Sequence, residues 1–236
     1  MPVKLFIRDN SEDNIYFTAA INEGLRHFLR GPAQYFILLN QDMYLEPTAV
    51  SEMVNFMNRN PACGIGAPLQ IHPQKPDYVI WAGGFEAFPL GKHLHGPAHR
   101  FKSDAAVHWA NGACMILRRQ MVEEIGLLDK NLVFIGSDSD YSFTARSRGW
   151  EVWRIANSRG VHDHGASGKS GNPIIEMLKL KDTIYFCRKW LTGELYRKMA
   201  FEGRDLPSEK VTELMQQLEK AKEMIARSVR EGETKV

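Results

Sequence analysis

The chain has 236 residues, 44% of them hydrophobic, which is enough to bury one substantial core. Its 30 basic and 28 acidic residues give a formal net charge of +2, so it lacks the positive excess of a dedicated nucleic-acid-binding protein. No stretch approaches the roughly 20 apolar residues that span a bilayer, and the opening MPVKLFIRDN is too charged for a secretory signal. We therefore expect a soluble, cytoplasmic protein that does not bind nucleic acid.

The three cysteines, Cys63, Cys114 and Cys187, lie far apart and outside any C-x-x-C or Cys/His pattern. Their spacing predicts neither structural zinc nor a redox pair. A reducing cytosol is the setting that this pattern favours.

Taken in chain order, short β-rich apolar runs alternate with segments of helical period. Strands are expected at residues 4–7, 35–39, 64–67, 78–81, 113–117 and 151–155. Helices are expected over 17–29, from Pro47 to just before Pro61, and over 142–150. Alternation of this kind predicts an α/β fold with a mostly parallel sheet flanked by helices.

Residues 85–101 change to Gly, Pro, His and aromatic residues without a period, which predicts a long surface loop of the kind that often serves substrates. The histidines in this segment, His93, His95 and His99, follow no metal-binding spacing. We expect them to be loop residues within reach of substrate.

The tail from 208 to 230 carries apolar residues on one face and charges on the other, which is typical of an amphipathic helix. We expect this helix to pack on the preceding domain, on a second subunit or on a membrane surface. The chain is accordingly divided into a domain at 1–190 and a C-terminal helical tail at 191–236.

The strand expected at 35–39, YFILL, runs directly into Asn40-Gln41-Asp42. In open α/β sheets ligands gather at the carboxyl ends of strands, so a carboxylate there is placed to meet a ligand or a metal. Asp42 is therefore a candidate metal ligand. A turn or a helix cap before Pro47 explains the same carboxylate equally well.

A second acidic site, Ser137-Asp138-Ser139-Asp140, stands where a loop meets an expected helix. Two acids at i and i+2 do not share a helical face, so one can meet a ligand while the other caps the helix. A positioned carboxylate within hydrogen-bond reach of a hydroxyl can remove its proton, which makes Asp138 a candidate general base. In the alternative interpretation both carboxylates only satisfy the N-terminus of the helix.

His162, in Val161-His162-Asp163-His164, follows the last expected strand. A neutral imidazole at a strand end is a common metal ligand, and with Asp42 it would complete a mixed nitrogen and oxygen site suited to Mn²⁺ or Mg²⁺. The alternative is a histidine with a purely structural role.

Read in order, these motifs resemble family 2 glycosyltransferases of the GT-A fold, especially the rhamnosyltransferase-like and galactofuranosyltransferase-like branch. The resemblance runs from about Lys4 to Trp190 and rests on the ordered motifs RDNSED, AINEGL, LLNQD, WANGACMILRR, EIGLLD, SDSDY and RSRGW. It implies a GT-A type, Rossmann-like sheet. The chain departs from the family pattern by opening at the second strand, without the usual first strand, and by Ser137 where an acid is usual.

The resemblance implies a role for each matched residue. Residues that bind the nucleotide are, by position, Asp9, Asn10, Asn22, Asn40 and Asp42. Residues that bind the sugar and the acceptor are Trp109, Asn111, Gly112, Asp140 and Arg146. The general base is Asp138, and the metal is held by Asp42 and His162.

The resemblance further implies an inverting enzyme that moves a sugar from a nucleoside-diphosphate sugar, of the dTDP or UDP type, to a saccharide or glycolipid acceptor, with Mn²⁺ or Mg²⁺ on the diphosphate. Contact with the inner face of a membrane and a homo-oligomer through the C-terminal helix are both compatible with it. The absent first strand and Ser137 favour one alternative, a non-catalytic nucleotide-sugar-binding module or an inactive paralogue. A nucleotidyltransferase is disfavoured, because the sequence contains no G-x-x-x-x-G-K-[ST] phosphate loop.

Overall fold

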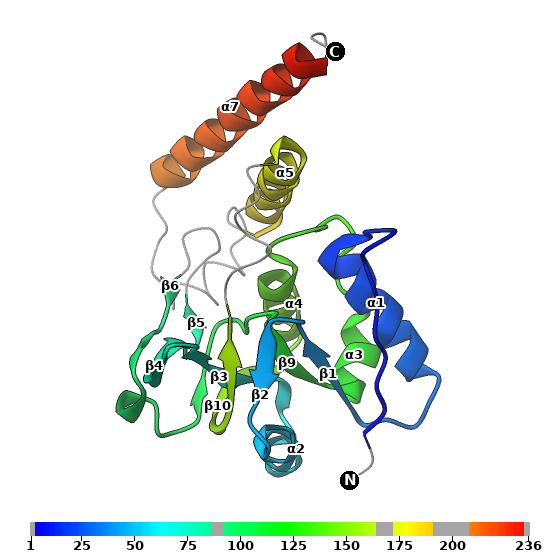
Figure 1. Ribbon diagram of the computed structural model, residues 1–236, viewed down its shortest axis with the longest axis vertical. Coiled ribbons are helices and arrows are strands. Elements are labelled where there is room, and N and C mark those ends of the chain that lie inside the picture. The colour runs from blue at the N-terminus through cyan, green and yellow to red at the C-terminus, as the bar shows by residue number, and fades with distance from the viewer. Residues whose placement is uncertain (1–2, 86–91, 164–171, 191–207, 234–236) are drawn as a thin grey trace.

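The computed structural model describes residues 3–85, 92–163, 172–190 and 208–233. Its helices are α1 (Tyr16–Leu29), α2 (Ala49–Arg59), α3 (Arg119–Ile125), α4 (Ser137–Ser147), α5 (Pro173–Trp190) and α7 (Ser208–Glu233), with a short 3₁₀ turn, η1 (Ala98–Arg100). The sheet lies between α2 and the group formed by α1, α3 and α4, while α5 and α7 stack beyond one end of it (Figure 1). The described helices and strands therefore form three layers with an appended helical pair.

Eight of the described strands form one sheet, whose main path has the order β1-β9-β3-β10-β2. These strands are β1 (Tyr35–Leu39), β2 (Met43–Leu45), β3 (Cys63–His72), β9 (Cys114–Arg118) and β10 (Glu151–His162). The remaining members are β4 (Lys75–Trp81), which pairs with β3, β7 (Gly96–Pro97), which pairs with β4, and β8 (Ala105–Ala106), which pairs with β10. A separate two-stranded sheet is formed by β5 (Gly84–Phe85) and β6 (Lys92–His93).

The predicted α/β class is confirmed, but the sheet is mostly antiparallel and not mostly parallel as predicted. Within the described chain, β10 and β3 are the one parallel pair. The physical reason is the position of β9, which enters between β1 and β3 and runs opposite to both. β1, β3 and β10 still share one direction, as alternating strands and helices require, although most neighbouring pairs do not.

The strand predicted at 4–7 is extended chain that pairs with no other described strand. Its side chains do alternate: the ring of Phe6 lies 5.2 Å from the ring of His27 on α1, whereas Leu5 and Ile7 are 79% and 76% exposed. The period of two is therefore real. Its inner face packs on a helix instead of completing the sheet.

Most other predicted elements are confirmed with shifted ends. β1 coincides with the predicted strand, α1 begins one residue earlier than predicted, and α2 begins at Ala49, just after Pro47. β3 is longer than predicted and almost entirely buried. β10 continues well beyond the predicted strand at 151–155 and ends at His162, so this histidine belongs to the strand itself.

Two apolar clusters fasten the helices to opposite faces of the sheet. Leu25 of α1, Met121 of α3 and Tyr141 of α4 belong to one cluster, which also contains buried residues of β1 and β9. Met53 and Met57 of α2 belong to the other. Successive side chains of β1 belong to the two clusters in turn, because successive Cβ atoms of a strand point to opposite faces of the sheet.

The predicted tail helix is present as α7, which extends to Glu233 and contacts α5, for example through a salt bridge between Arg188 and Glu219. Residues 86–91 of the predicted loop, and 191–207 after the predicted domain boundary, lie outside the described residues. In the part of the chain that is described, no helix has both the length and the hydropathy of a membrane span.

Gly160 is required where β10 pairs with β2. A Cβ at this position would lie 2.5 Å from Cε of Met43 and 2.9 Å from the backbone oxygen of Tyr44, which is held by the pairing. We expect Gly160→Ala to lower the free energy of unfolding by about 1–3 kcal/mol, measured by urea denaturation. Gly31→Ala is the control, because its Cβ would meet only Phe28 O at 3.6 Å, an ordinary contact. Equal stability of the two variants would contradict this view of the β2 and β10 pairing.

Candidate functional site

Asp42 and His162 are brought together by the pairing of β2 with β10. The register sets His162 opposite Met43, the residue after Asp42. The backbone N–H of Asp163 donates to the backbone oxygen of Asp42 at 2.9 Å. The backbone N–H of Met43 donates to the backbone oxygen of Asn40 at 3.1 Å. As a result, Nε2 of His162 lies 3.5 Å from Oδ1 of Asp42.

These two side chains offer atoms that a divalent cation accepts as ligands. Oδ1 of Asp42 is buried and accepts no hydrogen bond from the described residues, and His162 is 4% exposed. A buried carboxylate oxygen without a donor costs free energy, which a bound cation would offset. The described residues contain no group of three or more His, Cys, Asp and Glu side chains suited to a metal. The pair therefore fits a cation such as Mn²⁺ that takes its other ligands from water and a bound phosphate.

A buried amide network lies behind His162. Gln70 of β3 is fully buried, and its Oε1 lies 2.8 Å from Nδ1 of His162. Its Nε2 donates to Oδ1 of Asn111 at 3.1 Å, and the same oxygen accepts the backbone N–H of Ala113 at 2.9 Å. None of the sequence motifs predicted Gln70. Its only signal is one amide in the apolar run CGIGAPLQI, which a buried strand does not need for packing.

Asp138 lies in the first turn of α4 and contacts the loop before β9. Its Oδ2 accepts the backbone N–H of Gly112 at 2.8 Å, and its Oδ1 accepts that of Ser139 at 2.8 Å. Gly136 begins the helix with a φ of 75°, a left-handed conformation that glycine adopts without strain. Burial raises the pKa of Asp138 above its ordinary value, and the two amide donors oppose this shift. A raised pKa suits a carboxylate that has to accept a proton near neutral pH.

Residues 111–113 join the predicted base to the predicted metal pair. The backbone oxygen of Ala113 accepts the N–H of Asn40 at 2.9 Å, which ties this loop to the turn that carries the metal candidate. A Cβ on Gly112 would lie 3.3 Å from Oδ2 of Asp138, so glycine leaves room for the carboxylate. One continuous set of contacts therefore links both candidates, where the ends of β1 and β10 meet the start of β9 (Figure 1).

Asp140 points into the interface with α5. The residue is 1% exposed, and its Oδ1 accepts Nε1–H of Trp190 at 2.6 Å and lies 2.8 Å from Nζ of Lys189. Burial raises its pKa, and Lys189 acts in the opposite direction. The predicted role in acceptor or sugar binding does not fit this position, because the carboxylate already holds α5.

Asn22 fixes the chain after α3. Its Nδ2 donates to the backbone oxygen of Leu128 at 2.9 Å, and its Oδ1 accepts the backbone N–H of Leu128 at 3.0 Å. The side chain is buried, and both ends of its amide are used. The predicted contact with the nucleotide does not fit this arrangement.

Asp9 and Asn10 lie in the extended segment before α1. Oδ1 of Asp9 accepts the amide and the hydroxyl of Ser11 at 2.9 and 2.7 Å, so this exposed carboxylate shapes a local turn. Oδ1 of Asn10 is buried and has no hydrogen-bond donor among the residues described. Asn10 is therefore the better placed of the two to bind a ligand hydroxyl or base.

Trp109 and Arg146 both pack against aromatic rings. Trp109 is 4% exposed, and its ring lies edge-on to that of His93 at 5.0 Å between centroids. The Arg146 guanidinium lies 5.7 Å from the ring centroid of Phe143. His93 thus joins the predicted substrate loop to the motif that contains Trp109.

Comparison with known proteins gives three consistent findings. The sequence model of the family described as Glycosyl transferase family 2 matches residues 3–126. The chain is 25% identical over 172 residues to "O-antigen biosynthesis protein RfbC" of Myxococcus xanthus, covering 70% of this chain and 13% of that protein. The crystal structure of GalNAc-T7 with UDP, GalNAc and Mn²⁺ aligns with a TM-score of 0.59 and 18% identity, over 90% of this chain and 43% of that one. The chain thus spans a small part of the curated relative, and the structural likeness concerns the fold.

Proposed function

Because the chain belongs to glycosyl transferase family 2, we propose that it is an inverting glycosyltransferase with a nucleoside-diphosphate sugar as donor. The observation that carries this proposal is the network of contacts linking Asp42 and His162 to Asp138. The proposed donor is of the dTDP or UDP type, and the acceptor is a saccharide or glycolipid. The name of the Myxococcus xanthus relative, an O-antigen biosynthesis protein, agrees with a surface polysaccharide as product.

In the proposed reaction Asp138 takes the proton of an acceptor hydroxyl. The hydroxyl oxygen forms a bond to the anomeric carbon while the bond from that carbon to the diphosphate breaks on the opposite face. One such displacement inverts the anomeric configuration. The amides of Gly112 and Ser139 hold the carboxylate in one orientation, which keeps the base positioned before the acceptor arrives.

Asp42 and His162 would hold the divalent cation, Mn²⁺ or Mg²⁺, whose charge stabilises the leaving diphosphate when it is bound. The task of the protein here is to hold the two ligand atoms close together. The register of β2 with β10 does so through backbone pairing, with 3.5 Å between Nε2 and Oδ1. Ligand atoms fixed by a sheet need little rearrangement when the cation and the donor bind.

A thermal-shift screen of nucleoside-diphosphate sugars, with and without Mn²⁺, followed by a transfer assay, tests the proposal. We expect the correct donor to raise the melting temperature in a metal-dependent manner, because a ligand that binds only the folded state stabilises it. The same donor should then release nucleoside diphosphate when acceptor is added. If no nucleotide sugar binds or is cleaved, the proposal is wrong.

The competing reading is a module that binds nucleotide sugars without transferring them. Ser137, the departure that favours this reading, is 2% exposed, so it lies inside the fold and leaves the Asp138 contacts intact. Isothermal titration separates the two functions when it is paired with a donor-cleavage assay. Donor binding without sugar release, even with acceptor extracts, would favour the module.

Asp42→Asn is expected to weaken Mn²⁺ binding by at least about tenfold, which corresponds to about 1.4 kcal/mol. The neutral amide loses the charge that attracts the cation, while the side-chain volume is unchanged. Mn²⁺ titration followed by electron paramagnetic resonance measures the affinity. Asp163→Asn, which neutralises the exposed carboxylate that follows His162 in the chain, should bind Mn²⁺ like the wild type. Equal affinities for all three proteins would remove Asp42 from the metal site.

A further inference from the structure

Gln70 uses both ends of its amide inside an otherwise apolar strand. The parallel register of β3 with β10 pairs Gln70 with Gly160 and Ile71 with Val161. His162 is two residues after Gly160, so its side chain and that of Gln70 share one face of the sheet. The glycine between them adds no side chain there, and Oε1 of Gln70 reaches to 2.8 Å from Nδ1 of His162.

The direction of every hydrogen bond in this network follows from a backbone amide. The N–H of Ala113 can only donate, so the Asn111 atom that it meets at 2.9 Å is the oxygen. That oxygen accepts, so the Gln70 atom at 3.1 Å from it is the amide nitrogen. The other end of Gln70 is then its oxygen. Of the two neutral tautomers of His162, only the one with hydrogen on Nδ1 can donate to it.

We propose that Gln70 is a positioning residue that keeps the hydrogen of His162 on Nδ1 and leaves the lone pair of Nε2 for a divalent cation. This inference rests on the proposed function, because it concerns the cation that would bind the diphosphate. Nε2 lies 3.5 Å from Oδ1 of Asp42, which has no donor among the described residues. Two electron-rich atoms that face each other in a buried site repel one another unless a positive charge, either a proton or a metal cation, lies between them.

Asn111 extends the network by one step. Its Oδ1 holds the amide nitrogen of Gln70, so it prevents the Gln70 side chain from turning its nitrogen towards His162. Hydrogen-bond partners of the second ring nitrogen commonly set the tautomer and orientation of metal-binding histidines. Here the acceptor is a neutral amide anchored to backbone.

The test uses the full chain with ¹⁵N-labelled histidine, and compares the wild type with Gln70→Met. Methionine keeps the length and apolar volume of the side chain but lacks a strong acceptor. Long-range ¹H–¹⁵N spectra without metal should show hydrogen on Nδ1 of His162 in the wild type, assigned with His162→Gln, and a mixture of tautomers in Gln70→Met. Mn²⁺ affinity should fall about 10- to 100-fold in Gln70→Met.

Two further variants make the result specific. Gln70→Glu restores an acceptor opposite Nδ1 and, with a proton on the oxygen that faces Oδ1 of Asn111, should recover the tautomer and most of the Mn²⁺ affinity. Gln120→Met changes an exposed glutamine of α3 and should match the wild type in both measurements. These comparisons separate the hydrogen bond from a general loss of stability.

Three outcomes decide the matter. A wild-type His162 with its hydrogen on Nε2 overturns the proposal, even if no Gln70 variant folds. Unchanged tautomer and Mn²⁺ affinity in Gln70→Met also overturn it. A wild type that has the expected tautomer, lost in Gln70→Met, but binds no Mn²⁺ supports the role of Gln70 and counts against the proposed metal site.

Discussion

Replacing Asp138 with asparagine is expected to lower the rate of sugar transfer by about 10²- to 10⁴-fold, because an amide cannot take the proton of the acceptor hydroxyl. Donor binding should change little, since the hydrogen bonds of this carboxylate run to the amides of Gly112 and Ser139 and not to the metal pair. A transfer assay gives kcat, and isothermal titration gives the donor affinity.

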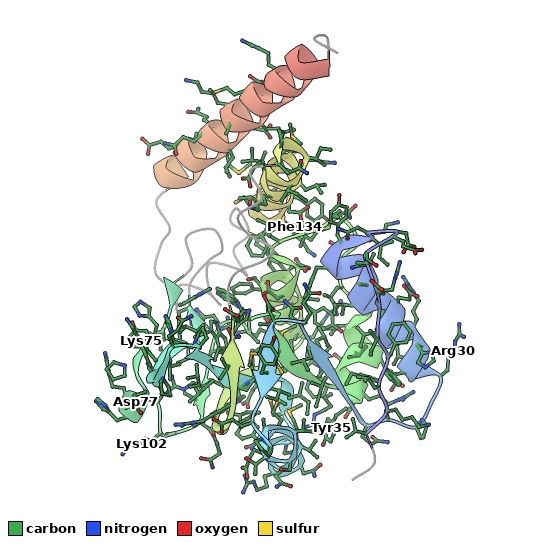
Figure 2. The ribbon with its side chains drawn as sticks, in the orientation of Figure 1. Arg30, Tyr35, Lys75, Asp77, Lys102 and Phe134 are labelled. Atoms are coloured by element: carbon green, nitrogen blue, oxygen red, sulfur yellow. The ribbon has the colours of Figure 1, made fainter. Side chains whose placement is uncertain are left out.

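The matched control for this variant is Asp77→Asn. Asp77 is exposed on β4, and Figure 2 shows it on the outer side of the molecule, well away from α4. The control should keep the turnover of the wild type. Unchanged turnover in Asp138→Asn would show that another group is the base.

The pH dependence of transfer provides an independent check on Asp138. A general base works only when it is deprotonated, so kcat/KM should fall as the pH falls through its pKa in the free enzyme. Burial raises that pKa, so the acid limb should lie above that of an ordinary exposed aspartate, whose pKa is about 3.9. The residual activity of Asp138→Asn should lack this limb. An acid limb that persists in the variant would assign the titration to a different residue.

The fold was predictable from the sequence as far as local patterns determine it. The GT-A type fold and the family implied by the resemblance are confirmed by the family match and by the alignment with a glycosyltransferase structure. The direction of β9 was not predictable, because a run such as CMILR has the same β-rich composition whichever way it enters the sheet. Packing against β1 and β3 decides that direction, and these are contacts distant in sequence.

The motifs predicted candidate site residues but not the direction of their side chains. Asp138 and Asp140 belong to one acidic motif. Residues two positions apart in an α-helix point about 200° away from each other around the axis, so Asp140 faces α5 while Asp138 faces the loop before β9. Asn22 occupies the expected helix yet binds the backbone of Leu128. Gln70 went unpredicted because its partners, His162 and Asn111, come next to it only when β3 and β10 pair.

The carboxylate of Asp140 also ties α5 to α4 through Lys189. Nζ of Lys189 lies 2.8 Å from Oδ1 of Asp140 and 3.0 Å from Oδ2 of Asp129. The side chain of Asp140 is 2% exposed, whereas that of Lys189 is 31% exposed. Removing the lysine would therefore leave a negative charge in a buried position, with the Nε1–H of Trp190 still donating to it. A second contact also holds α5 in place. Phe134, labelled near α5 in Figure 2, lies in the loop before α4, and its backbone N–H donates to Oδ2 of Asp182 on α5 at 2.5 Å.

Lys189→Met is expected to lower the free energy of unfolding at neutral pH by about 3 kcal/mol. This value is the lower end of the range for removing one partner of a buried ion pair, because the lysine is partly exposed. Burial already raises the pKa of Asp140, and loss of Lys189 removes an interaction that lowers it, so the pKa should rise further. A group with a raised folded-state pKa destabilises the fold when it is ionised, so the penalty should shrink as the pH falls through that pKa.

Urea denaturation at neutral and at mildly acidic pH measures the Lys189→Met effect. Lys179→Met is the matched control, because it removes a partly exposed pair with Glu176 and should cost at most about 1 kcal/mol. A loss in Lys189→Met that is the same at both pH values would show that the apolar contacts of the lysine stem, and not the buried charge of Asp140, account for its contribution. A loss that disappears on acidification would identify the charge on Asp140 as the cause.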